Sequence, residues 1–321
     1  MRARERGWLL WAALATIYVV WGSTYLAIRV MVETMPPLLA AGVRFATAGA
    51  IFWTVLRVAA GPQRVRVTRR QLAGAGVMGL LLPFGGNGLV TVAEQDVPSG
   101  LAALIIGVVP LWVVLFRSAH GDRVPRVTLA GVAVGFAGLA LVVLPGGRPG
   151  DAPLWGVLLT LAASLSWAAG SFYSRRLPLP EDAFASTAFQ MLLGGLAMIA
   201  AGLVAGEAGD VRLSAFSADS VLAFAYLIFI GSLLAFTAYV WLLRNAPIST
   251  VATYAFVNPV IAIFLGWAIL SEEVTATVVI GALAVVVSVA SVVRRESGPG
   301  EEESPPQGAA PKADPAESRA A

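Results

Sequence analysis

The sequence predicts an all-α integral membrane protein of ten transmembrane helices, arranged as two inverted five-helix repeats. Its composition, its long apolar runs and the similarity of its two halves each support this prediction. The 321 residues are 58% hydrophobic and 13% charged, and the mean hydropathy is +0.79. A soluble chain of this length would form about two domains, whose cores could not bury so much apolar surface. Composition therefore places the chain in a membrane.

Ten apolar runs are long enough to cross a hydrocarbon core of about 30 Å as helices. They occupy residues 8–28, 38–56, 72–92, 98–116, 127–144, 153–172, 184–204, 219–243, 247–270 and 274–293. Turn-forming or charged stretches separate them, such as Pro36-Pro37 and residues 117–126 and 175–182. The first run follows three arginines and contains Ala13-Leu14-Ala15, which resembles a signal-peptide cleavage site. It continues to Ile28, so we expect a retained span.

Arginine and lysine are distributed unequally between the loops. With the N-terminus in the cytosol, eighteen of them fall in cytosolic segments and three on the other side. This asymmetry follows the positive-inside rule and favours an even number of spans. We therefore expect a multi-pass protein with residues 1–7 and the tail, 296–321, both in the cytosol. The tail is rich in Pro, Glu, Ala and Ser, which predicts disorder.

The two halves of the chain, residues 8–144 and 153–293, resemble each other at an offset of 146–149 residues. The matching positions are Trp21 with Trp167, Arg44 with Gln190, Gly85 with Gly231, Pro98 with Pro247, Pro110 with Pro259, and Gly135 with Gly281. Because five is odd, two such repeats in series must insert in opposite orientations. Inverted repeats are typical of secondary transporters.

Several local motifs are similar to those of the EamA-type transporters of the drug/metabolite transporter superfamily. They are Trp21-Gly22-Ser23-Thr24-Tyr25, Arg44-Phe45, the paired prolines of the fourth and ninth spans, and the segment from Leu270 to Thr275. The resemblance covers residues 8–293 and implies export, less often uptake, of amino acids, other metabolites or drugs. It also implies a location in the inner (cytoplasmic) membrane of a bacterium. In relatives, spans one, three, four, six, eight and nine line the cavity. The first repeat departs from the pattern, since no Glu-Glu step follows Pro110 as Glu272-Glu273 follows Pro259.

Polar and aromatic residues at membrane depth are the candidates for solute binding. They are Trp21, Arg44, Asn87, Trp112, Trp167, Tyr239, Tyr254 and Asn258. Arg44 is suited to a substrate carboxylate, or else pairs with Glu33 or with helix-end carbonyls. The tryptophans line an aromatic cavity or serve as packing residues. Asn258 directly precedes Pro259, which makes it the strongest polar candidate.

Two prolines lie in the middle of predicted spans, where each removes one helical hydrogen bond. Pro110 and Pro259 therefore produce either static kinks or hinges that expose carbonyls to the cavity. Gly131 and Gly135, four residues apart in the fifth span, predict a helix-packing face.

The chain offers little for catalysis. It has no cysteine, one histidine in a predicted loop, one lysine in the tail and no P-loop. We expect no catalytic residue, metal or cofactor, and no nucleic acid partner; the partners are a small-molecule substrate, the lipid bilayer and, as an open option, a second copy. The alternative to a transporter is a receptor or assembly subunit.

Acidic residues cluster at the predicted outer helix ends, at Glu94, Asp96, Glu272 and Glu273. We expect solvated loop charges there. Because no acid lies deep in a span, we expect facilitated transport or solute exchange. Proton antiport is the alternative, should Glu94 or Glu272 lie deeper than drawn.

Overall fold

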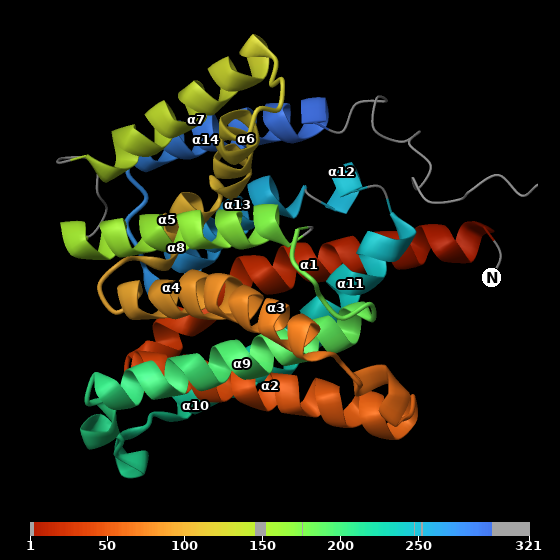
Figure 1. The fold of residues 1–321 in the computed structure, drawn as a ribbon. Helices are drawn as coiled ribbons and strands as arrows, with labels where there is room; N and C mark the ends of the chain where they lie inside the picture. Colours follow the sequence, from red (N-terminus) through yellow and green to blue (C-terminus); the bar gives the residue numbers. More distant parts are fainter. Residues whose placement is uncertain (1–2, 145–151, 175, 247, 252, 297–321) are drawn as a thin grey trace, which may run out of the picture.

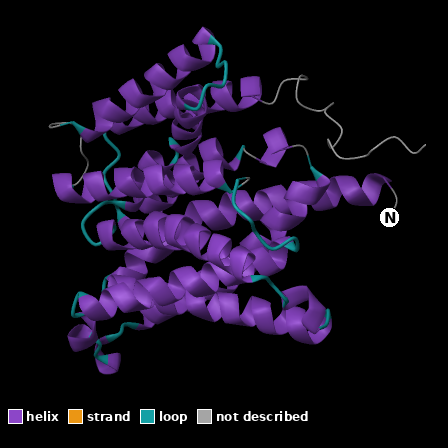
Figure 2. Ribbon diagram, in the orientation of Figure 1, coloured by secondary structure: helices purple, strands orange, loops and turns teal. Residues whose placement is uncertain are grey.

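The computed structural model describes residues 3–144, 152–174, 176–246, 248–251 and 253–296. Within these ranges the chain is helical with connecting loops and contains no strand (Figure 2). The first repeat comprises α1 Ala3–Val32, α2 Pro37–Ala59, α3 Arg69–Gly79, η2 Leu80–Gly88, α4 Leu89–Ala93, α5 Ser99–Ile106, α6 Val109–Ala119 and α7 Arg126–Val143. The second comprises α8 Leu154–Tyr173, α9 Ala183–Val204, α10 Ala218–Tyr226, η6 Leu227–Leu234, α11 Ala235–Asn245, α12 Ile248–Val251, α13 Tyr254–Leu270 and α14 Ala276–Glu296.

Within the described ranges, nine helical stretches are long and apolar enough to cross a membrane, and α13 is a shorter apolar helix. The ten predicted spans are thus present, with boundaries close to those expected. The predicted ninth span begins as the short helix α12 and continues as α13, and residues 247 and 252 lie outside the described part. The predicted disordered tail also lies outside it, apart from Glu296 at the end of α14.

Two spans contain a π-helix, and the two π-helices occupy equivalent positions in the two repeats. η2 lies between α3 and α4 in the third span, and η6 lies between α10 and α11 in the eighth. They contain Gly85 and Gly231, which the sequence comparison had paired. The internal repeat therefore extends to a rare backbone geometry.

Equivalent helices of the two repeats pack against each other: α2 lies along α9, and α7 lies along α14 (Figure 1). Glycines permit this close approach. A β-carbon at Gly49 would lie 2.6 Å from the backbone nitrogen of Leu192, and one at Gly281 would lie 2.7 Å from the carbonyl oxygen of Gly138. Gly135 packs against Ser288 of α14 in the same way, as its predicted packing role requires.

The bundle has two ends. The proximal end carries the N-terminus of α1, to the right in Figure 1. The distal end, to the left, carries the α4–α5 connection and the connection from α13 to α14. These two connections belong to different repeats and meet directly, because the Glu272 carboxylate accepts hydrogen bonds from the backbone amides of Ser99 (2.7 Å) and Gly100 (3.1 Å).

Candidate functional site

A cavity of about 120 Å³ lies between the two repeats in the centre of the bundle. By the same measure one water needs about 10–15 Å³, so several waters or a small ionic group fit. The first repeat contributes residues of α1, α2, η2, α4, α5 and α6 to its wall, and the second contributes residues of α8, η6, α11 and α13. The site is therefore shared by both repeats, at the position where secondary transporters bind their solutes.

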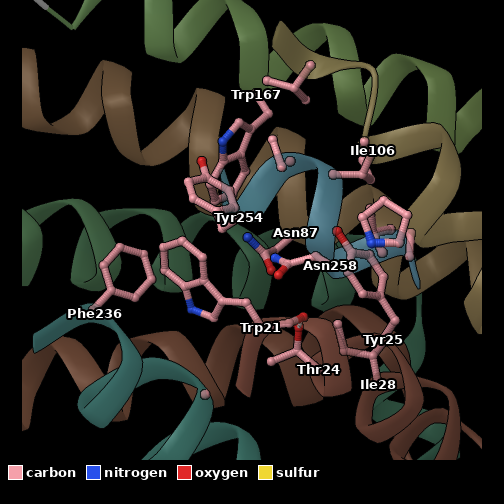
Figure 3. Close-up of a pocket in the computed structure, with 18 of the residues that line it drawn as sticks. Trp21, Thr24, Tyr25, Ile28, Asn87, Ile106, Trp167, Phe236, Tyr254 and Asn258 are labelled. Carbon is pink, nitrogen blue, oxygen red and sulfur yellow. Dashed lines mark hydrogen bonds between the residues drawn. The ribbon is translucent and has the colours of Figure 1, made fainter. Parts of the chain in front are cut away.

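One wall of the cavity is aromatic (Figure 3). The Trp21 ring is 5.4 Å from that of Phe236 and 5.1 Å from that of Tyr254, measured between centroids, and it meets both edge to face. Trp167 approaches from the opposite repeat and lies against Gly86, where a β-carbon would be 2.4 Å from the indole Cε3. This wall offers a large apolar contact area to a ligand.

Polar side chains enter the same space. Figure 3 shows the amides of Asn87 and Asn258 near its centre, between Trp167 and Trp21. Asn258 is 7% exposed, and with its nitrogen facing the carbonyls of Tyr18 and Tyr254 it donates to both, at 3.3 and 3.2 Å. Few polar groups in an apolar cavity are the usual arrangement for orienting a small molecule.

Arg44 is the one arginine in the cavity wall, within the described residues. It is 3% exposed, its Nε donates to the Ser232 hydroxyl at 3.1 Å, and its guanidinium lies 4.6 Å from the Phe45 ring centre. Its Nη1 has no hydrogen-bond partner in the described chain. The expected alternative, an ion pair with Glu33, is not formed between the described side chains; Ser232 takes that place.

The backbone of two spans is interrupted beside the cavity. The fourth span breaks at Gly107 and Val108, and Pro110 stands in the first turn of α6, where a proline needs no helical partner. Pro110 thus lies in the middle of its span, as predicted, but it follows a break between α5 and α6 and removes no hydrogen bond from a helix interior. Pro259 does lie inside its helix, α13, and a β-carbon at Gly107 would lie 2.8 Å from its Cγ. The interruption in one repeat thus faces the proline of the other.

The structure separates the predicted site residues into two groups. The cavity wall contains Trp21, Arg44, Asn87, Trp167, Tyr254, Asn258, Pro110 and Pro259. Trp112 and Tyr239 lie outside it. Trp112 donates from Nε1 to the Ser164 hydroxyl at 3.0 Å and packs on Phe136, and Tyr239 supports the wall by contacting the rings of Trp21 and Tyr254.

Some wall residues were not predicted. Thr24 and Tyr25 follow Trp21 within one helical turn, so the motif that predicted Trp21 could also have indicated them. Phe236 and Gly86 carried no signal in the sequence, since an apolar residue in an apolar span is not distinctive.

The acidic residues at the distal end do not all behave as expected. Asp96 and Glu273 are exposed, as predicted. Glu272 is half-buried and binds the start of α5. Glu94 is 0% exposed, so our expectation of a solvated charge is wrong for this residue. The reason is that helices distant in sequence, α8, α2 and α1, pack against α4 and enclose its end, an arrangement that local sequence cannot show.

Comparisons with known proteins agree with this architecture. The model of the EamA-like transporter family matches residues 6–144 and 154–294. An uncharacterized inner membrane transporter of Escherichia coli, YedA, is 40% identical over 259 residues, which is 80% of this chain and 81% of the relative. A probable amino-acid metabolite efflux pump of Salmonella typhimurium is 27% identical over 276 residues, covering 83% of this chain and 89% of the relative. One crystal structure matches with a TM-score of 0.61 at 21% identity, over 91% of this chain and 98% of its own, which supports the fold alone.

Proposed function

This chain belongs to the EamA-like transporter family, and we propose that it exports small organic solutes, amino acids or related metabolites, by alternating access of its two repeats. That it is a membrane transporter follows from its family and its relatives. The observation that supports the solute class is the buried Arg44, whose free Nη1 stands in a cavity with an aromatic wall.

A buried guanidinium with an unused donor favours an anionic partner. Leaving a charged donor unpaired in an apolar surrounding costs free energy, and a carboxylate is the partner that guanidinium groups bind best. The rings of Trp21 and Tyr254 and the indole of Trp167 suit an apolar or aromatic body. A monocarboxylate with an apolar side chain, such as an apolar amino acid, satisfies both parts of the cavity. The printed name of the Salmonella relative agrees with this class.

Transport requires that the cavity open to each side in turn. The contact of Gly107 with Pro259 joins a broken helix of one repeat to a proline-containing helix of the other, so we assign the hinge to this pair and to Pro110. The π-helices η2 and η6 border the same cavity, through Asn87 and Gly231. Rocking of the repeats about these interruptions would expose the site alternately.

The test is solute exchange in proteoliposomes. Vesicles loaded with unlabelled L-phenylalanine should take up radiolabelled L-phenylalanine, L-leucine or L-methionine faster than protein-free vesicles. Trp167→Ala and Asn258→Ala should lower the rate at least severalfold, because each removes a group from the cavity wall. Trp155→Ala is the matched control, since this tryptophan lies on the same helix, α8, but is 47% exposed on its outside.

Two results would refute the proposal. Absence of exchange with every amino acid in the panel would remove the solute class, and a protein of the receptor or subunit type would show no flux with any solute. Unchanged kinetics in both cavity variants would remove Trp167 and Asn258 from the site. A growth screen of cells that overproduce the protein, challenged with toxic amino acid analogues, would then extend the search for the solute.

A further inference from the structure

We propose that Glu94 is a proton-binding site, and that its protonation is linked to the binding of a solute carboxylate at Arg44. The carboxylate part of this inference rests on the proposed function. The proton site rests on the position and surroundings of Glu94 alone.

Glu94 stands at the distal end of the third span, one turn beyond Val90, the cavity-lining residue of α4. It directly follows the last residue of α4, and its backbone amide bonds the carbonyl of Val90 at 2.9 Å, so it continues the helical register. Val90 and Asn87, about one and two turns earlier, line the cavity. Residues spaced in this way share one helix face. The side chain of Glu94 therefore belongs to the face that the cavity borders.

The Glu94 carboxylate is buried without a hydrogen bond. It is 0% exposed, and neither Oε1 nor Oε2 has a partner in the described chain. The nearby Arg29 does not supply one, because its Nη1 donates to the main-chain carbonyls of Glu94 and Gln95 instead. A carboxylate that is ionised under these conditions would be strongly destabilised.

The charged and titratable groups around Glu94 come from three neighbouring segments. Tyr25 and Arg29 face it from α1, Arg44 from α2, and Glu272 from the α13–α14 connection. The other elements that pack against α4, η2 and α8, contain no Asp, Glu, Lys, Arg or His. Burial, followed by the negative charge of Glu272, raises the pKa of Glu94 well above its ordinary value, and Arg29 and Arg44 oppose this only in part.

The protonation state of Glu94 sets the charge balance around Arg44. A neutral Glu94 leaves the guanidinium without a nearby counter-charge, so a solute carboxylate binds strongly. An ionised Glu94 supplies that counter-charge and repels the solute carboxylate. Affinity for a carboxylate should therefore be highest below the pKa of Glu94 and fall as the pH rises through it, by at most about tenfold per pH unit for one proton.

This linkage replaces our expectation that no acid takes part in transport. The proton and the carboxylate favour each other's binding, so they travel together rather than in opposite directions. Net export together with a proton therefore requires an outward solute gradient that exceeds any inward proton gradient.

The experiment compares the wild-type protein with Glu94→Gln, whose neutral amide imitates the protonated acid. Binding of radiolabelled 3-phenylpropionate and L-phenylalanine to purified protein is measured across neutral and alkaline pH, with phenethylamine as the probe that lacks a carboxylate. The wild-type affinity for 3-phenylpropionate should fall as the pH rises, and that of Glu94→Gln should stay high and flat. Asp96→Asn, an exposed acid at the same end, is the control and should keep the wild-type slope.

Infrared spectroscopy tests the proton site without any ligand. A carbonyl band of a protonated carboxyl group should be present in the wild type at neutral pH, decline on alkaline titration, be absent in Glu94→Gln and persist in Asp96→Asn. A band that survives Glu94→Gln, or a wild-type affinity slope in that variant, would overturn the inference. Failure of all three probes to bind, with the infrared band as expected, would instead refute the solute class of the proposed function.

Discussion

Replacement of Glu272 by alanine should loosen the distal end of the transporter. The Glu272 carboxylate joins the α13–α14 connection of the second repeat to the first turn of α5 in the first repeat, through the amides of Ser99 and Gly100. Both amides belong to the unpaired N-terminal turn of a helix, where an acceptor is most effective. Glu272→Ala removes both hydrogen bonds and the only carboxylate that this turn contacts among the described residues.

The expected change in the open fraction follows from the free energy that helix N-caps contribute. Loss of an N-terminal cap costs about 0.5–2 kcal/mol. If the two bonds exist only while the distal end is closed, the open fraction should rise roughly 2- to 30-fold in Glu272→Ala. Glu273→Ala should have no such effect, because Glu273 is exposed.

A single cysteine can report this opening, since the chain contains no cysteine of its own. Ser99→Cys keeps the backbone amide that Glu272 binds and places a thiol at a site that is 0% exposed. The rate at which an impermeant maleimide labels this thiol is proportional to the open fraction when opening is rapid. Equal labelling rates with and without Glu272→Ala would show that the hydrogen bonds of Glu272 do not hold the distal end closed. An equal increase in Glu273→Ala would show the same.

Three further predictions concern topology, packing and the cavity wall. In intact cells, an impermeant thiol reagent should label Gln95→Cys but not Arg66→Cys, and the reverse pattern would contradict cytosolic termini. Gly138→Leu should lower the thermal stability of the detergent-purified protein, with an overpacking cost of about 1–3 kcal/mol, because a β-carbon there would lie 2.5 Å from the nearest side chain of α14. Gly131→Ala is the control, because a β-carbon there would lie 3.5 Å from the nearest atom, an ordinary contact distance. Equal melting temperatures of the two variants would argue against the close packing of α7 on α14. Gly86→Val should displace the Trp167 indole, which lies against Gly86, and should raise the KM for exchange more than it lowers the maximal rate. An unchanged KM would exclude the Trp167 indole from solute contact.

Much of the fold could be predicted because it depends on features that repeat along the chain. The sequence shows the length of the spans, the unequal distribution of arginine and the near-constant offset between the halves. That offset also paired Gly85 with Gly231, which the structure places in the two π-helices. The cavity was partly predictable for the same reason: Trp21, Trp167 and Asn258 are unusual residues for membrane depth, so they stood out.

What the sequence could not show depends on which helices become neighbours. Trp112 looked as suitable for solute binding as Trp167. In the structure it instead donates a hydrogen bond to Ser164 and packs on Phe136, so it serves in helix packing. Glu94 looked like a loop acid because it follows the end of an apolar run. Its burial is decided by helices α8, α2 and α1, none of which is adjacent to it in sequence.

The paired π-helices also bear on the origin of the protein. A π-helix holds more residues per turn than an α-helix and occurs in well under 1% of residues in folded proteins. Two independent insertions at the same place in both halves, at η2 and at η6, would be a rare coincidence. Duplication of a single ancestral half that already contained the π-helix accounts for both with one event. On that history, the wider helical turn beside the cavity is older than the two-repeat chain itself.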